Sequence, residues 1–303
     1  MAPIPEFWSR PTSLFCESAL TGPPEYWNTY SSVFIVLVGL YGALFSTPHH
    51  GHKAVRHMNC VLAVVGIGSI GYHYTGHWGW SKIDQWGEVL LGLKVLPAIV
   101  DLVLYRWFHP KPLGPSQNAH PESFTQELVS TLVYGSTTFV LLFAIIIDSQ
   151  LEKNIADDVV GACLGSALLF LALSTITSHK QFLAIHPQGQ TIKSYIKSTI
   201  IFILVSVVIW TLEERVFCLQ DPEFWSGIPL HAVWHFTSSY GFYLMLQVVV
   251  LYDAERYGFD AYVIMPETAR GRSGVDVSYG VVLDTLACRV VWTKERVHGK
   301  KLI

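Results

Sequence analysis

The chain has 303 residues, of which 51% are hydrophobic and only 14% are charged. Soluble domains usually carry about 25% charged residues, so this deficit predicts a membrane protein. The net charge of −3 is small and no basic stripe runs along the chain. We therefore expect no nucleic acid among the partners and expect the lipid bilayer to be one.

Seven stretches of the chain are long and apolar enough to cross a bilayer, which requires about 20 mainly apolar residues. They predict an all-α, polytopic membrane protein. In chain order the predicted spans are Tyr26–Phe45, Val55–Thr75, Asp84–Trp107, Gln126–Ile147, Asp157–Ser178, Ser194–Leu212 and Ile228–Tyr252. Residues 1–25 then form an N-terminal segment, residues 26–252 one seven-helix membrane domain, and residues 253–303 a tail.

The distribution of Lys and Arg predicts the orientation of these spans. Basic residues gather in alternate loops and in the tail, whereas the loops on the other side are acidic. By the positive-inside rule the N-terminus is lumenal and the tail is cytosolic. The chain ends in Lys300-Lys301-Leu302-Ile303, which resembles a dilysine retrieval signal and predicts the endoplasmic reticulum or Golgi. The alternative is a chance tetrapeptide in a basic tail.

Of the five cysteines, only Cys16 and Cys218 fall on the predicted oxidising side. Disulfides persist in such compartments, so we expect a bridge between these two residues. Two unpaired thiols are the alternative.

Polar residues inside the apolar stretches predict a metal site. Ser69 and His73 lie four residues apart in the second predicted span, and His231 and His235 have the same spacing in the seventh. This spacing puts each pair on one helix face. The predicted topology brings both pairs, together with Asp84, to the lumenal leaflet, where unpaired polar groups are costly and usually functional.

Three histidines match the ligand number of a catalytic zinc site, which keeps its fourth position for water. We therefore predict zinc on His73, His231 and His235. Asp84 is expected to orient the water or accept its proton, and Ser69 to donate a hydrogen bond to the developing oxyanion.

Each of these residues also has a structural alternative. The histidines can be hydrogen-bonding groups of the core or interface, Ser69 can bond back to its own helix, and Asp84 can cap a helix. We expect His77 at the lumenal surface. A further group of histidines is expected in a solvated cytosolic loop, namely His49, His50, His52 and His57.

The same residues resemble the alkaline ceramidase family, within a superfamily of seven-helix zinc hydrolases that includes the adiponectin receptors. The matching motifs are Gly66-Ile-Gly-Ser69-x-x-x-His73-x-Thr75, Asp84, His231-x-x-x-His235, Glu25-Tyr-Trp-Asn-Thr, Phe15-Cys16-Glu17, and Trp210-x-x-Glu213 followed by Cys218. The resemblance implies the zinc ligands and catalytic residues named above and the Cys16–Cys218 bridge. It also implies hydrolysis of ceramide to a sphingoid base and a fatty acid.

Two departures from the family pattern stand out. The family's calcium site uses an Asp-Trp-x-Glu-x-Asn segment and the Glu before the first span. Here Leu14 and Ala19 replace two of its oxygen side chains, which leaves Glu17 and Glu25 as the candidate calcium ligands. The family's Asp-Glu-Leu-Pro reads Asp84-Gln-Trp-Gly, and Lys94 follows in the same span. Ceramide remains the expected substrate, and because of these departures another lipid amide is an alternative. A second alternative is a non-catalytic receptor-like protein that keeps a structural zinc.

Overall fold

The computed structural model describes residues 16–18, 22–46, 53–108, 189–256, 260–264 and 289–293, together with the helical positions 132, 135 and 139. Apart from these three positions, the predicted spans Gln126–Ile147 and Asp157–Ser178 lie outside the described residues. The histidines His49, His50 and His52 and most of the tail lie outside them as well.

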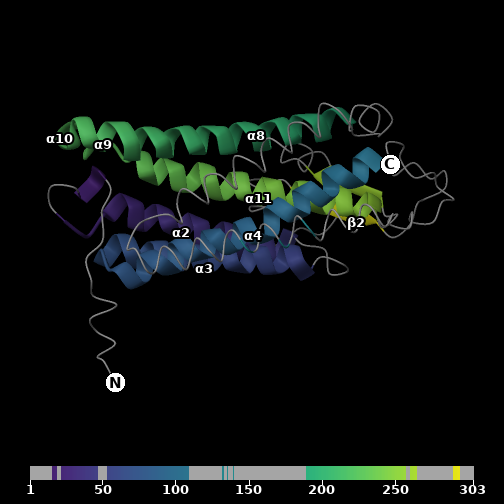
Figure 1. Ribbon diagram of the computed structural model, residues 1–303, viewed down its shortest axis with the longest axis horizontal. Helices are drawn as coiled ribbons and strands as arrows, with labels where there is room; N and C mark the ends of the chain where they lie inside the picture. Colours follow the sequence, from purple (N-terminus) through teal and green to yellow (C-terminus); the bar gives the residue numbers. More distant parts are fainter. Residues whose placement is uncertain are drawn as a thin grey trace, which may run out of the picture.

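Long helices form most of the described part and run side by side (Figure 1). Their bounds are α2 Tyr26–Tyr41, α3 Lys53–Thr75, α4 Trp78–Phe108, α8 Gly189–Leu212 and α11 Leu230–Arg256. Shorter helical pieces flank them, with bounds η1 Cys16–Ser18, η2 Gly42–Ser46, η3 Glu213–Phe217, α9 Cys218–Gln220 and α10 Pro222–Trp225. The long helices correspond to the five predicted spans that the described residues cover.

Four helix starts differ from the prediction, and those of α3 and α8, at Lys53 and Gly189, come two and five residues early. Helix α4 begins at Trp78 rather than Asp84, because the chain reverses tightly at Gly76, which has a φ of +65°. A positive φ is cheap only for glycine. Asp84 therefore lies in the second turn of α4, and the alternative of a helix cap at Asp84 is wrong. Helix α11 begins at Leu230, two residues after the predicted start.

Length and composition mark two of the described helices as able to cross a membrane, over Tyr26–Phe45 and Ile192–Leu212. Both carry exposed apolar side chains, such as Leu40 on α2 and Leu204 on α8. An apolar outer face suits contact with lipid. Within the described residues, helices α3, α4 and α11 do not meet the same criterion of length and apolar composition. They carry more polar and charged side chains, so the seven-span topology remains a prediction.

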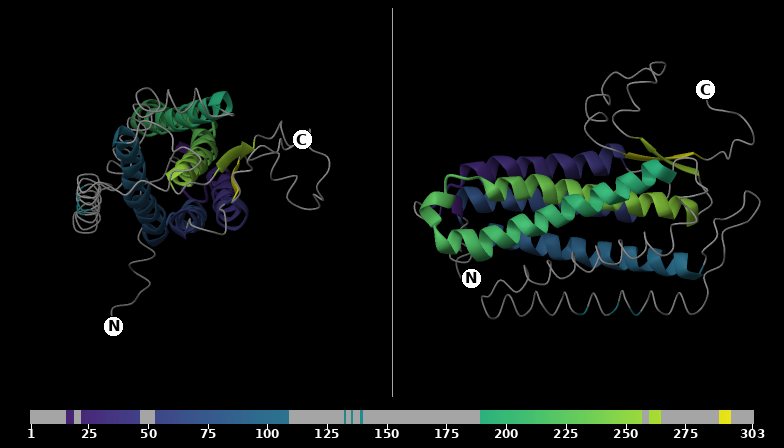
Figure 2. Two further views of the ribbon diagram at one scale, coloured as in Figure 1. Left: turned by 90° about the vertical axis from the view of Figure 1, so that its right-hand side faces the viewer. Right: turned by 90° about the horizontal axis from the view of Figure 1, so that it is seen from above.

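Helix α11 lies among the other described helices and contacts α2, α3, α4 and α8 (Figure 2). Its stretch from Phe242 to Leu251 is buried throughout. It forms the apolar core with residues such as Ile35 of α2, Leu62 of α3 and Ile196 of α8.

Glycines let α3 approach its two neighbours closely. A Cβ atom added at Gly66 would lie 2.7 Å from the backbone nitrogen of Val36 on α2, and one added at Gly68 would lie 2.7 Å from that of Asp84 on α4. No side chain fits at such distances without moving a backbone. The Gly66-Ile-Gly68 motif therefore sets the packing distance of both helices around the turn that carries Ser69.

The tail adds a small antiparallel sheet that the all-α expectation did not include. Strand β1, Asp260–Ile264, pairs with strand β2, Arg289–Thr293, with Tyr262 opposite Val291. β-Branched and aromatic residues fit the pleated surface of a sheet, and both segments are rich in them. The sheet lies at the end of the helices opposite α9 and α10 (Figure 1).

Candidate metal centre

Three histidines from two helices meet beside the end of the molecule that carries α9 and α10. His73 lies in the last turn of α3, while His231 and His235 occupy the first two turns of α11. Each offers one ring nitrogen, and these atoms lie within 4.8 Å of one another. The side chains are 1%, 3% and 0% exposed, respectively. The predicted convergence of the three histidines is confirmed, and together they could hold one metal ion.

Each histidine is oriented through its Nδ1 atom by a polar side chain from another segment. Nδ1 of His73 lies 2.5 Å from Oε2 of Glu25, and Nδ1 of His231 lies 3.2 Å from Oε2 of Glu213. Since an ionised carboxylate only accepts hydrogen bonds, these Nδ1 atoms donate. Nε2 is then the nitrogen that carries the lone pair in both rings.

His235 follows the same pattern with a hydroxyl group. Its Nδ1 atom lies 2.7 Å from Oγ of Ser31, and that hydroxyl donates to the carbonyl oxygen of Asn28 at 3.1 Å. Ser31 can therefore accept from Nδ1–H of His235. Three imidazoles whose Nδ1 atoms are all engaged by neighbouring groups form the donor set of a metal centre, because a ligating histidine usually donates its second N–H in this way. The residues present thus fit a metal ion.

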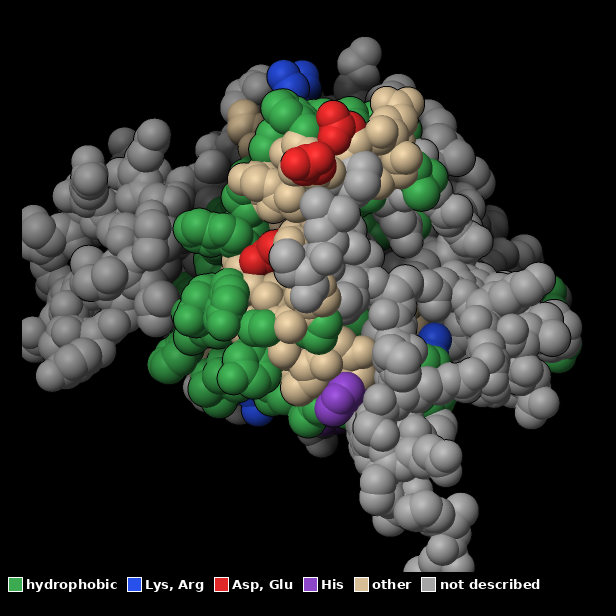
Figure 3. Space-filling model, turned by 90° about the vertical axis from the view of Figure 1, so that its left-hand side faces the viewer, with side chains coloured by type: hydrophobic (Ala, Val, Ile, Leu, Met, Phe, Trp, Pro, Cys, Tyr) green, Lys and Arg blue, Asp and Glu red, His purple; other side chains and the backbone are tan. Residues whose placement is uncertain are grey.

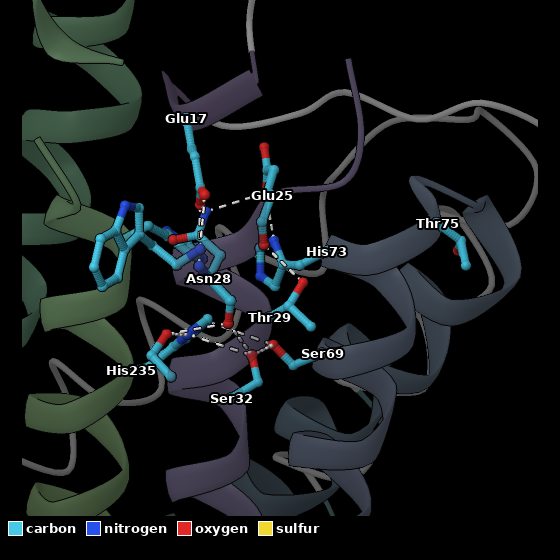
Figure 4. A network of polar contacts seen from close by, with 12 residues as sticks. Glu17, Glu25, Asn28, Thr29, Ser32, Ser69, His73, Thr75 and His235 are labelled. Atoms are coloured by element: carbon cyan, nitrogen blue, oxygen red, sulfur yellow. Dashed lines mark hydrogen bonds and ion pairs between the residues drawn. The ribbon is translucent and has the colours of Figure 1, made fainter. Parts of the chain in front are cut away.

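Ser69 lies one turn deeper than His73 and is fully buried. Its Oγ atom is 2.9 Å from Oγ of Ser32 and 3.4 Å from Nε2 of His235 (Figure 4). The hydroxyl therefore points to the side of His235 that would face a metal. Ser69 hydrogen-bonds to side chains of α2 and α11. The alternative prediction, a hydrogen bond to its own helix, is therefore wrong.

Asp84 is half-buried on α4, and its backbone packs against Gly68 next to Ser69. This position places α4 beside the turn that carries Ser69. The catalytic role of the Asp84 carboxylate stays a prediction.

A disulfide links the short segments at this end. Cys16 of η1 and Cys218 of α9 are bonded, with their Cα atoms 5.2 Å apart, so the predicted bridge is confirmed. Glu213 and these two cysteines lie close enough together to suggest a second metal site. Because both sulfur atoms are already in the disulfide, we exclude that site.

The two candidate calcium ligands are bonded within the protein. Glu17 accepts hydrogen bonds from the backbone N–H groups of Trp27 at 2.7 Å and Asn28 at 3.0 Å. Burial raises the pKa of the Glu17 carboxyl above its usual value, and these two bonds oppose that rise. Glu25 is fully buried and bonded to His73.

Two histidines outside the centre lie among the described residues, and one of them, His57, belongs to helix α3 rather than to the predicted loop. His77 is half-buried in the turn between α3 and α4, and His57 is exposed on α3. Lys94 is also exposed, on α4. Within the described chain, the buried histidines that could together hold a metal ion are the predicted three.

The residues that orient the histidines were not predicted from the sequence; they are chiefly Ser31, Ser32 and Glu213. Glu213 appeared only as part of a motif, without a role. A usable signal was present, because polar side chains within an apolar span usually face the protein interior and are paired there. Ser31 and Ser32 lie within such a span.

The outer surface at this end is mixed in character. Apolar side chains cover much of it, with several acidic side chains among them (Figure 3). Trp27 and Phe224 are 62% and 61% exposed. Exposed aromatic residues of this kind are typical of the interface between a membrane and water. The three histidines are buried, beneath this surface.

Comparisons with known proteins identify the family of the chain. Residues 15–264 match the family model described as Ceramidase. The chain is also 27% identical over 270 residues to a Dictyostelium discoideum protein named "Putative alkaline ceramidase dcd3A", covering 80% of this chain and 87% of that protein. The matched range includes the three histidines, Ser69, Asp84 and both bridging cysteines. The chain therefore belongs to the ceramidase family.

Proposed function

We propose that the protein is a zinc-dependent ceramidase, which hydrolyses the amide bond of ceramide to give a sphingoid base and a free fatty acid. The observation that carries this proposal is the buried cluster of His73, His231 and His235 in a chain of the ceramidase family. Zinc favours imidazole nitrogen and three protein ligands in catalytic sites. A bound zinc ion would supply Lewis acidity and lower the pKa of water to about 7.

The surrounding residues of the chain supply the remaining chemistry. Amide hydrolysis adds water across the C–N bond, so one group must accept a proton from water and another must stabilise charge on the carbonyl oxygen. We assign the first role to Asp84 and the second to the Ser69 hydroxyl, which lies 3.4 Å from Nε2 of His235. A buried hydroxyl at this position favours an enzyme over a scaffold that merely keeps a structural metal.

The substrate and the location follow from the surface of the helices. The exposed apolar faces of α2 and α8 and the family support an enzyme within a membrane. Ceramide would then reach the site from the bilayer. We propose seven membrane spans with a lumenal N-terminus and a cytosolic tail, in the endoplasmic reticulum or Golgi. Another lipid amide is the second candidate, because Gln85 of α4 departs from the family pattern and bonds Lys82 at 2.7 Å.

The test is ceramide hydrolysis combined with metal analysis on the purified full-length protein. We expect about one zinc per wild-type chain and measurable release of fatty acid. His231→Ala should lose both, because two imidazoles no longer complete the site. His77→Ala is the matched control, since His77 lies in the nearby turn outside the cluster, and it should keep both.

Unchanged zinc content and turnover in His231→Ala would contradict the proposal. Zinc binding with turnover of a different lipid amide, but not of ceramide, would keep the zinc hydrolase and replace its substrate.

A further inference from the structure

The acidic residues that precede and begin α2 have a different use here from the one that the family resemblance implied. Calcium takes six to eight oxygen ligands, and two side chains of the implied set are replaced by Leu14 and Ala19. The remaining two, Glu17 and Glu25, both accept hydrogen bonds from groups of this protein.

Glu17 is bonded to the start of α2. One of its carboxylate oxygens accepts from the N–H of Trp27 and the other from the N–H of Asn28. The first turn of a helix has unsatisfied N–H groups and a partial positive charge of about half a unit. This helix start therefore stabilises the charge of Glu17 and donates one hydrogen bond to each of its oxygens. Glu25 occupies the N-cap position itself but makes no capping bond with its side chain.

Glu25 is bonded to the metal centre. Its Oε2 atom lies 2.5 Å from Nδ1 of His73 and accepts from Nδ2 of Asn28 at 3.1 Å. The backbone N–H of Glu25 also donates to the carbonyl oxygen of His73 at 2.9 Å. Two hydrogen bonds, one from the side chain and one from the backbone, thus fix the first residue before α2 to the last turn of α3.

The oxygens near this pair do not make up a calcium shell. Asn28 Oδ1 is buried and has no hydrogen-bond partner, which makes it a candidate for an additional side-chain ligand. With Glu17 and Glu25 it gives three side chains, whereas calcium takes six to eight oxygen ligands. These donors do not fit calcium.

We propose that Glu17 and Glu25 act in place of a calcium site: Glu17 fastens the N-terminal segment to α2, and Glu25 is the positioning residue of His73. The metal centre then assembles without calcium. This inference rests on the proposed function, because it requires a metal ion on His73.

The test measures zinc affinity by competition with a chelator, and thermal unfolding, on the full-length protein with added calcium and with a calcium-selective chelator. We expect the wild-type protein to give the same zinc affinity and the same midpoint in both conditions. A calcium-dependent rise in either quantity that Glu17→Gln or Glu25→Gln removes would overturn the proposal and establish a calcium site.

Substitution of cobalt for zinc distinguishes a residue that positions a metal ligand from one that only stabilises the fold. Zinc is d¹⁰ and has no ligand-field spectrum, so cobalt(II) is the probe of the coordination geometry. Glu25→Gln should change the cobalt absorption spectrum and weaken zinc binding about 10- to 100-fold. Glu17→Gln is the matched control and should lower the unfolding midpoint while leaving the spectrum unchanged. An unchanged spectrum in Glu25→Gln would contradict the positioning role.

The two proposals fail differently. A wild-type protein that binds no zinc would contradict the proposed function. A wild-type protein that binds zinc and also responds to calcium would contradict only the inference about Glu17 and Glu25.

Discussion

Helix α11 consists of two stretches with opposite chemistry. Its first turns carry His231, His235 and Ser239, which are all buried. The stretch from Phe242 to Leu251 is also buried but is apolar apart from Gln247. Burying a polar group without a partner costs about 1–3 kcal/mol, so the first stretch requires specific partners, whereas the second requires only good packing.

The two histidines of the polar stretch find their partners outside α11: Glu213 of η3 bonds His231, and Ser31 of α2 bonds His235. Ser239 instead donates to the carbonyl oxygen of His235, one turn earlier in the same helix, at 2.5 Å. The apolar stretch packs against α2, α3 and α8. One end of the helix therefore contributes residues to the candidate site, whereas the other mainly stabilises the helix bundle. Substitutions can test this division.

The largest effect on stability is expected from breaking the covalent link at the polar end. Cys218→Ser removes the disulfide to Cys16, which closes a loop of 202 residues in sequence separation. We expect a loss of about 2–5 kcal/mol in the free energy of unfolding and weaker zinc binding, because Glu213, which bonds His231, lies beside the two cysteines.

Thermal unfolding with and without reductant measures this effect. Cys60→Ser is the control, because Cys60 is an exposed free cysteine on α3. Equal unfolding midpoints for Cys218→Ser and wild-type protein would show that the polar end holds together without the bridge.

A cavity in the apolar stretch should lower stability without affecting the site. Leu246 is fully buried, and its replacement by alanine should cost about 2–5 kcal/mol through lost packing and the cavity that remains. We expect zinc stoichiometry to stay at the wild-type value. Leu204→Ala, on the exposed face of α8, is the control and should cost much less. Loss of zinc in Leu246→Ala would mean that the two stretches are not separable.

The smallest of these effects is expected from Glu213→Gln, which keeps the shape of the side chain but removes its charge. Zinc affinity should fall about 10- to 100-fold, equivalent to about 1.4–2.8 kcal/mol, because the carboxylate no longer orients and polarises His231. Competition with a chelator measures the change. Glu223→Gln, exposed on α10, is the control. Identical affinities for the two variants would remove Glu213 from the metal centre.

Spacing and apolar context were enough to predict several parts of the structure. The five described long helices fall where continuous apolar sequence lies, and the i,i+4 spacing of His231 and His235 put both on one face of α11. The start of α4 was missed by six residues, because Trp78 to Ile83 are helical in a stretch that mixes polar and aromatic residues. The β1–β2 sheet was missed because its strands are short and about 25 residues apart in the chain.

The sequence by itself determined the mainly helical architecture and the three histidines, because both depend on residue type, local spacing and the order of the apolar stretches. It also determined the pair of bridging cysteines, because the distribution of charged residues placed only these two on the oxidising side. Only the tertiary structure decided which side chains orient the histidines. Glu25 and His73 are 48 residues apart, and Ser31 and His235 are 204 residues apart. Such bonds depend on how neighbouring helices are rotated and how closely they approach, and the pattern of one helix does not contain that information.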